Sequence, residues 1–489
     1  MHSITLEQHR LIPAPAVTGT ISGRKTLLTL HASLFTLVMS AGLLYPVLQL
    51  DGQTMMYPAC ALVTVSLVWI LWSWHFVRGT LFEPYPLFML SAGLFNGGQA
   101  LLEVFGFNPE GILNGHVSAD VVTPAMYLVA LSLLALHTGA LLALKDRSSR
   151  VTRCRDTVER RRATRLAGWL LLGAAAVPTF TLLSSSLSVV FDYGYLGLYR
   201  YQNTMSTAQA MSAFFVPGVI FLLAGSKHHH WLQCVSVILA AAYAIIYLFL
   251  GARGSAAMGC IAVAWVFDRS IRKVPRSLIA GLALVALLVF SVVRETRGAS
   301  GRDRLSLSDQ FEALTNMENP ISSSISEMGN SLVTVTHTLQ LVPSTREFDY
   351  GVSYLYAALA VVPNIGWEVH PSIAHGLLSD WLIRTVDPVV ASAGGGLGFS
   401  FIAEAYLNFG WFGGPFFLAL IGYAVCWMFS KADGDDPANH ALTASFLSFF
   451  FVFSRGESAI VARGLVWYAI LPYLLAAVLT IRRRKGVDQ

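Results

Sequence analysis

Five arginines stand at the ends of apolar runs or just beyond them, in a chain with few other charges. They are Arg253, Arg294, Arg297, Arg302 and Arg304. A guanidinium is a planar fork that binds a phosphate or carboxylate through two parallel hydrogen bonds. The pattern predicts an anion site, suited to a pyrophosphate at a bilayer surface. The alternative is that these arginines lie at the lipid interface or pair with Glu295 and Asp303.

A second polar group lies in the segment 394–415. Ser400, Glu404 and Asn408 follow one another at intervals of four residues, which places them on one face of a helix whose other faces are apolar. A carboxylate on such a helix is unfavourable in a membrane bundle unless it is paired or used. The sequence therefore predicts Glu404 as a general base and Asn408 as a substrate contact. A structural pair between Glu404 and one of the arginines is the alternative.

Three weaker groups complete the candidates. A stripe of Asn96, Gln99 and Glu103 is more typical of helix–helix contacts than of catalysis. Histidines can act as bases near neutral pH, and His337 is retained as a candidate catalytic residue. Arg455 lies beside Glu457 in a last charged cluster, which either joins the anion site or pairs internally.

The overall composition indicates which elements must position these residues. The chain has 489 residues, of which 55% are hydrophobic and 12% charged, whereas soluble domains are about 25% charged. So few charges cannot cover the surface of a soluble protein of this size, and a disordered or collagen-like chain is excluded as well. The sequence predicts an all-α polytopic membrane protein.

About twelve apolar runs are candidates for membrane-spanning helices. Their approximate ranges are 26–48, 55–77, 84–106, 121–144, 166–184, 209–226, 231–250, 255–268, 277–293, 411–430, 441–454 and 462–481. The first run is of full span length and follows a polar segment, which favours a retained helix over a cleaved signal peptide.

The distribution of lysine and arginine predicts the orientation. With both termini in the cytoplasm, all six lysines fall inside, and the external basic residues are arginines only. A general bias toward arginine explains that count equally well. The argument for a site therefore depends on the position of the arginines at the outer ends of the helices.

One external loop is far larger than the others and divides the chain into three parts. Residues 1–293 hold nine predicted spans, 294–411 form the large loop, and 412–489 hold three spans and a basic tail. Within the loop, segments 321–342 and 350–362 are predicted to be helices at the membrane surface. The five cysteines fall in predicted spans or cytoplasmic loops, so neither a disulfide framework nor a metal site is expected.

Four segments resemble the Wzy-type O-antigen polysaccharide polymerases of bacterial inner membranes. They are GARG at 251–254, RETRG at 294–298, FDYGVSY at 348–354 and GGGLGFSFIAEAYLNFGWFGG at 394–414. The resemblance is strongest over 250–430. It implies a GT-C-like membrane fold and an active site on the periplasmic side of the membrane.

The resemblance also implies the reaction. The substrate would be an oligosaccharide repeat unit on undecaprenyl pyrophosphate, and the growing chain would be transferred to a new lipid-linked unit. Arginines would hold the pyrophosphate, and Tyr350 and Tyr354 would line the sugar path. Neither metal, cofactor nor nucleic acid is expected, whereas a flippase and a chain-length regulator are expected as partners.

Three other classes of protein stay open from the sequence. One is a sensor or scaffold with an external ligand site, which requires no base at Glu404; the others are a flippase and a ligase. A flippase or transporter for lipid-linked sugars predicts ionisable residues near the middle of the spans and two repeated halves, neither of which is evident. The related O-antigen ligases carry a histidine followed by Asn, Ser or Gln in the large loop. His337 precedes a threonine here, which weakens the ligase hypothesis.

Overall fold

The computed structural model describes residues 21–145, 157–195, 197–198, 206–296, 315, 319–364 and 366–485. Every regular element within these ranges is a helix. Ten of the described helical segments are long and apolar enough to cross a membrane. The protein is therefore an all-α, multi-pass membrane protein, as its composition predicts.

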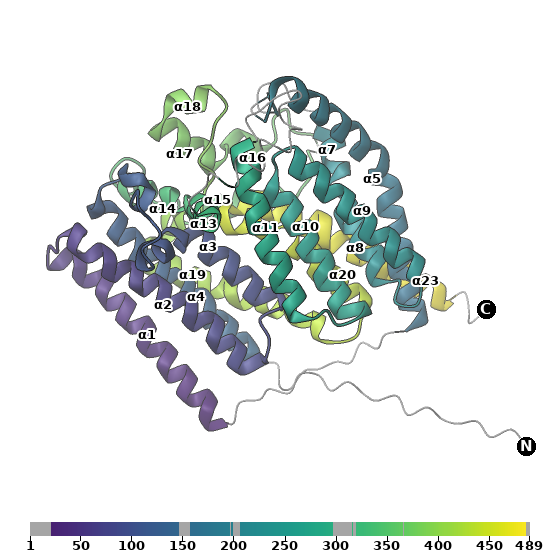
Figure 1. Ribbon diagram of the computed structural model, residues 1–489, viewed down its shortest axis with the longest axis horizontal. Coiled ribbons are helices and arrows are strands. Elements are labelled where there is room, and N and C mark those ends of the chain that lie inside the picture. Colours follow the sequence, from purple (N-terminus) through teal and green to yellow (C-terminus); the bar gives the residue numbers. More distant parts are fainter. Residues whose placement is uncertain are drawn as a thin grey trace, which may run out of the picture.

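The first four long helices form one side of the molecule (Figure 1). They are α1 (Ile21–Val47), α2 (Gly52–Arg78), α3 (Pro84–Val104) and α4 (Ala119–Lys145). Helix α4 contacts the other three and also α19. The apolar window of α4 is 89% buried, whereas that of α1 is 22% buried. Helix α4 is thus the centre of this group, and α1 lies at its edge.

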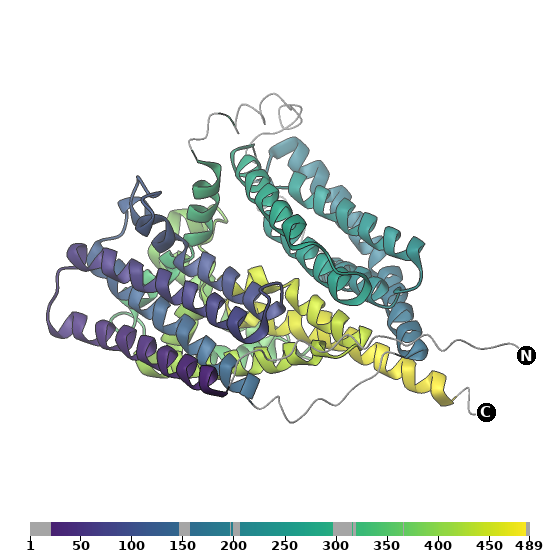
Figure 2. The same cartoon turned by 60° about the horizontal axis from the view of Figure 1, so that its bottom comes forward.

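A second group of helices lies on the opposite side in both views (Figures 1 and 2). It comprises α5 (Val158–Tyr193), α7 (Ser206–Ser212), α8 (Phe215–Ala224), α9 (His230–Phe249), α10 (Arg253–Val266) and α11 (Arg276–Thr296). Helix α8 packs against α5, α9 and α10. Helix α11 makes few contacts, and only 6% of its apolar window is buried.

The two shortest predicted spans do not correspond to candidate membrane helices. The run 255–268 corresponds to α10, whose last turn continues as a π-turn, η3 (Phe267–Ile271). The run 441–454 is divided between α20 (Pro437–Leu447) and α21 (Phe450–Arg455). The other ten predicted spans correspond to the ten candidate membrane helices.

The large predicted loop contains short helices that pack on the bundle. They are α13 (Pro320–Gly329), α14 (Leu332–Leu341), α15 (Val352–Leu359), α16 (Pro371–His375), α17 (Leu378–Val386) and α18 (Pro388–Ser392). The single surface helix predicted for 321–342 is wrong. A turn separates α13 from α14, α13 packs on α3, and α14 packs on α4 and α19. The apolar face of this segment is therefore covered by protein.

Helix α19 (Phe401–Phe429) is interrupted at Gly410, whose φ of 66° is a left-handed conformation that glycine readily adopts. The interruption exposes a backbone carbonyl, and Asp349 N–H donates to Leu407 O at 3.0 Å. Gly351 N–H donates to the Asn408 side chain at 2.8 Å. The first half of α19 is thus held by the loop before α15, which brings together two of the segments that carry the family resemblance.

The last helices are α22 (Ser458–Leu465), η6 (Val466–Ile470) and α23 (Leu471–Lys485). Together they form the final candidate span, 458–482. Helix α23 packs against α5 and α20, and α22 packs against α15. This last span therefore joins the second group of helices to the short helices of the loop.

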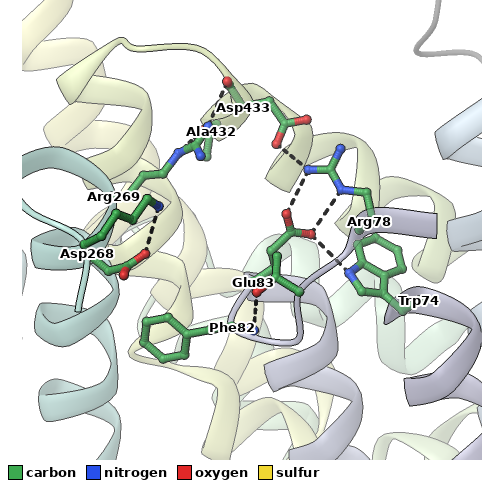
Figure 3. Close-up of polar contacts among 10 residues, drawn as sticks. Trp74, Arg78, Phe82, Glu83, Asp268, Arg269, Ala432 and Asp433 are labelled. Atoms are coloured by element: carbon green, nitrogen blue, oxygen red, sulfur yellow. Dashed lines mark hydrogen bonds and ion pairs between the residues drawn. The ribbon is translucent and has the colours of Figure 1, made fainter. Parts of the chain in front are cut away.

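Polar side chains join three loops at one end of the bundle (Figure 3). Arg78, at the end of α2, forms ion pairs with Glu83 at 3.0 Å and Asp433 at 2.8 Å. Arg269, in the π-turn after α10, donates to the backbone oxygens of Ala432 and Asp433. The loops that follow α2, α10 and α19 therefore meet at one end, as an alternating path across a membrane requires.

Candidate functional site

Arg253 begins α10 and lies at the other end of that helix from Arg269. Its guanidinium donates to Phe290 O of α11 at 2.6 Å and forms an ion pair with Glu327 of α13. The two side chains are 15% and 25% exposed, so the pair is partly shielded from solvent. Arg253 therefore has a carboxylate partner, Glu327, which lies 74 residues away in the sequence. The two partners suggested by the sequence were Glu295 and Asp303.

Arg455 ends α21 and lines the same small cavity as Arg253. Its guanidinium carbon lies 5.7 Å from the centre of the Phe95 ring. Within the part of the chain that the structure describes, no carboxylate pairs with this guanidinium and no hydrogen bond is made by it. The internal pair with Glu457 that the sequence left open does not form. Glu457 instead accepts hydrogen bonds from Leu378 N and Ser379 N at 2.8 and 3.1 Å.

Two cavities meet at Arg455. The smaller, of about 80 Å³, is lined by Arg253, Glu327 and Arg455 together with Phe95 and Phe290. The larger, of about 480 Å³, shares Arg455 and Gly254 with it. The larger volume is in the usual range of ligand pockets, roughly 300–1,000 Å³. Both arginines therefore line the smaller cavity, and Arg455 also lines the larger one.

The first turn of α10 adds backbone donors to the same region. Ala252, Gly254 and Ser255 line the larger cavity, and no side chain caps this helix terminus. The first N–H groups of a helix have no acceptor within the helix, and the helix dipole adds partial positive charge there. Two guanidiniums and an uncapped helix terminus together are suited to bind a phosphate group.

Glu404 lies elsewhere, fully enclosed at 1% exposure. Its carboxylate accepts hydrogen bonds from Ser353 Oγ at 2.8 Å and from the N–H and hydroxyl of Ser458 at 2.7 and 2.5 Å. Asn408 donates to Ser353 Oγ at 2.8 Å. Among the described residues, Glu404 therefore forms hydrogen bonds with two serines and not the ion pair with an arginine that the sequence left open. The carboxylate joins α15 and the start of α22 to α19, and it lines neither of the two cavities.

A comparison with protein families decides what kind of protein this is. The family model for O-antigen polysaccharide polymerase Wzy matches residues 28–485, nearly the whole chain. The chain belongs to this family. Membership supports a glycosyltransferase-type polymerase that joins O-antigen repeat units, rather than a flippase or a ligase. No curated protein and no solved structure matches the chain.

The other residues that the sequence proposed for this Wzy-family protein are dispersed. His337 is half-buried in α14, and its ring contacts Gln340 one turn along the helix at 3.1 Å. Tyr350 is 78% exposed. Tyr354 stacks on Phe409 with ring centres 6.0 Å apart, and it packs against the tilted ring of Phe417 at 4.4 Å. None of these residues lines the two cavities at Arg455.

Four of the predicted arginines lie at or after the end of α11. Arg294 is in the last turn of that helix, four residues after the Phe290 carbonyl that Arg253 contacts. Helix α11 therefore ends next to the polymerase's two cavities. Arg297, Arg302 and Arg304 lie outside the described residues.

The polar stripe on α3 has the structural role that its pattern predicted. Asn96 donates to Ser454 O and accepts from Ser400, and Gln99 donates to Ser326 O and Asn330. These bonds hold α13 and the end of α21 against α3. Asn96 and Gln99 thus help to position α13, which carries Glu327, and the end of α21, which carries Arg455.

Sequence reasoning missed Glu327 as a residue of the site. It was one of several acids in a long loop, and no spacing relates it to Arg253. A signal was available in Ser324, which lies three residues before Glu327 on α13 and lines the same small cavity. Residues three apart share a helix face, so an amphipathic reading of 320–329 would have placed the two together.

Proposed function

We propose that this polymerase transfers a growing glycan from a lipid pyrophosphate carrier to a new lipid-linked repeat unit, without a metal ion. In this proposal Arg253 and Arg455 hold the pyrophosphate. The observation that carries it is Arg455, which lines both cavities, shares the smaller one with Arg253, and forms no ion pair or hydrogen bond through its guanidinium with a described residue. An exposed guanidinium that pairs with no carboxylate among the described residues, next to an uncapped helix terminus, is suited to an anionic ligand.

The chemistry follows from the charge that develops in the reaction. A hydroxyl of the acceptor sugar forms a new bond to the anomeric carbon of the donor sugar. The bond from that carbon to the pyrophosphate oxygen breaks, and its electron pair stays on the pyrophosphate. Guanidiniums placed beforehand stabilise this negative charge as it develops. The hydroxyl proton passes to a base.

Glu327 is the carboxylate best placed to be that base in this proposal. It lines the smaller cavity with the two arginines, and its side chain is 25% exposed. A bound pyrophosphate competes with Glu327 for the Arg253 guanidinium and so leaves the carboxylate available for a proton. Glu404, the base proposed from the sequence, stays the alternative. Its carboxylate is enclosed by hydrogen-bond donors from Ser353 and Ser458.

The proposal places the reaction on the periplasmic side of the bacterial inner membrane. Arg78, Arg269 and Lys273 lie at the end of the bundle where α10 terminates, and Arg253 lies where that helix begins. Cytoplasmic loops are enriched in lysine and arginine. The Arg253 end is then periplasmic, which is where a lipid-linked unit arrives after a flippase has moved it. A chain-length regulator is the second expected partner.

The remaining arginines and aromatic residues keep roles in the proposal. Arg294, Arg297, Arg302 and Arg304 extend the pyrophosphate site, because α11 ends beside Arg253. Tyr350, Tyr354 and Asn408 are proposed to lie along the path of the glycan, and His337 stays a candidate base.

The test uses the full-length protein in proteoliposomes with undecaprenyl-pyrophosphate-linked repeat units. The wild-type protein should join the units into a ladder of glycans. Arg455→Lys keeps the charge and loses the fork, and we expect the rate of polymer formation to fall about 10²-fold. The matched control is Arg384→Lys, an exposed arginine of α17 that lines neither cavity.

Two outcomes would overturn the proposal. A wild-type protein that moves the lipid-linked units across the bilayer without joining them is a flippase. A ladder of normal rate from the Arg455→Lys variant, equal to that of the control, would show that this guanidinium does not bind the donor.

A further inference from the structure

We infer that the larger cavity binds the hydrocarbon tail of the lipid carrier, and that Gly259 keeps the passage for this tail open. The inference rests on the proposed function, because it takes the donor to be a lipid pyrophosphate. It adds a binding site for the tail inside the protein. Without such a site, the whole hydrocarbon chain of the carrier would stay in the bilayer.

Three of the polar side chains of the larger cavity lie together at one end. Arg455, Glu457 and Ser379 lie there, beside the first turn of α10. The carboxylate of Glu457 is already bonded to the N–H groups at the start of α17. The arginine thus remains as the group that can attract an anionic head group.

The cavity continues from this polar end along one face of α10. Ala252, Ser255, Met258 and Gly259 line it, at intervals that lie on one side of a helix. Gly259 is six residues beyond Arg253, about 9 Å along the axis at 1.5 Å per residue. The cavity therefore runs inward from the arginines, into the part of the bundle that the apolar helices enclose.

Apart from Tyr243, Ser255 and Ser448, the rest of the cavity lining is apolar. Val216 and Pro217 of α8, Met258 of α10 and Val452 of α21 line it. Helix α8 belongs to one of the candidate membrane spans. The hydroxyl of Ser448, also in this wall, already donates to Ser445 O at 2.6 Å. A sugar here would leave most of its hydroxyls without partners, which is unfavourable in an apolar site, whereas an isoprenoid chain would not.

Gly259 is the residue that determines how much room the tail has. It is buried, yet a Cβ atom built there would have no other atom within 4 Å. It also lines a narrow third cavity of about 10 Å³, whose walls are all apolar or aromatic, including Val219 and Val263. A side chain at this position would point into the space between the two cavities and fill it.

Binding measurements on the full-length protein in nanodiscs test the inference. The probes are undecaprenyl pyrophosphate, farnesyl pyrophosphate and inorganic pyrophosphate. We expect Gly259→Phe to raise the Kd of both prenyl pyrophosphates about tenfold or more and to leave that of inorganic pyrophosphate unchanged. A Gly259→Ala variant, which fills less of the space, should show a smaller effect in the same direction.

The matched control is Gly173→Phe. Gly173 is a helical glycine of α5 that also has no atom within 4 Å of a built Cβ, but it is exposed and lines no part of the cavity. It should bind all three probes like the wild type. A photoreactive prenyl pyrophosphate should label peptides of α8 and α10 in the wild type and in this control.

The results separate this inference from the proposed function. Wild-type affinity of Gly259→Phe for both prenyl probes would overturn the tail site, whether or not the protein makes polymer. Loss of affinity for inorganic pyrophosphate as well would also overturn it, because the substitution would then act on the head-group site. A tail site that behaves as expected in a protein that makes no polymer would instead contradict the proposed function alone.

Discussion

Arg253 and Arg455 line the same small cavity, but only Arg253 has a carboxylate partner among the described residues, Glu327. The ion pair balances one guanidinium and leaves the other available. This difference between the two arginines suits a site that must bind a doubly charged head group and later release it. Arg253 can exchange Glu327 for the head group on binding and return to Glu327 on release. The arrangement leads to the first prediction.

Glu327→Gln should separate a catalytic carboxylate from one that only orients Arg253. If Glu327 takes the proton, the rate of polymer formation at saturating donor should fall about 10²-fold or more, with donor affinity equal to that of the wild type or higher. Arg253→Lys should instead weaken donor binding. The two variants are compared in single-turnover assays at several donor concentrations. A Glu327→Gln variant whose turnover is normal would exclude the base.

Glu404 is predicted to be a structural residue of the described bundle. A glutamine at this position can accept from Ser458 N and donate to the two serine hydroxyls, so Glu404→Gln should keep its melting temperature and most of its activity. Glu404→Ala leaves three donors unpaired and should lower the free energy of unfolding by about 1–3 kcal/mol. Thermal unfolding in detergent and the ladder assay check both. A large loss of polymer in a Glu404→Gln variant of normal stability would restore it as the base.

The close packing of α4 on α19 depends on two glycines. A Cβ at Gly139 would lie 1.8 Å from Ala419 O, and one at Gly422 would lie 2.0 Å from Leu136 O. Small residues allow helix backbones in a membrane to approach this closely. Gly139→Ala and Gly422→Ala should each destabilise the protein by about 1–3 kcal/mol, as measured by thermal unfolding. Gly281→Ala, on the exposed face of α11, is the control and should be neutral; equal effects would contradict the packing argument.

The polar cluster at the end opposite the site should matter for stability and not for chemistry. The Arg78 side chain is 8% exposed and pairs with Glu83 and Asp433. Removing it breaks both of these ion pairs at a largely buried position, and we expect Arg78→Ala to lower stability by about 1–3 kcal/mol. A double-mutant cycle with Asp433→Asn measures the coupling of the two residues. Polymer formed per folded molecule should stay at the wild-type value; a selective loss of activity would link this end to the reaction.

Much of the architecture could be predicted from the sequence. Ten of the predicted spans correspond to candidate membrane helices, because partition into a bilayer depends on the composition of each segment. The two that do not, at α10 and at α20 with α21, are the shortest runs. Their helices are enclosed by neighbouring helices, so a full apolar length is not needed. Helix breaks such as the one at Gly410 were not predicted, since several glycines lie nearby and the chain alone does not distinguish them.

The candidate site was only half predictable. The sequence pointed to Arg253 because an arginine at the end of an apolar run is unusual whatever the fold. It also pointed to Glu404, whose helix face is polar, but the partners of that carboxylate come from α15 and α22. Proximity between such distant segments depends on how helices pack, and packing does not appear in local spacing.

The sequence by itself determined that this is a multi-pass membrane protein with its scarce charges at the ends of helices, because the free energy of burying each segment depends on its own residues. Only the tertiary structure decided which of those charges neutralise one another. Arg253 pairs with Glu327, and Glu457 caps α17 beside Arg455, which pairs with no carboxylate in the described part of the chain. Electrostatic and hydrogen-bond energies act over a few ångströms, so the partner of a charge is chosen by the fold that brings distant residues together.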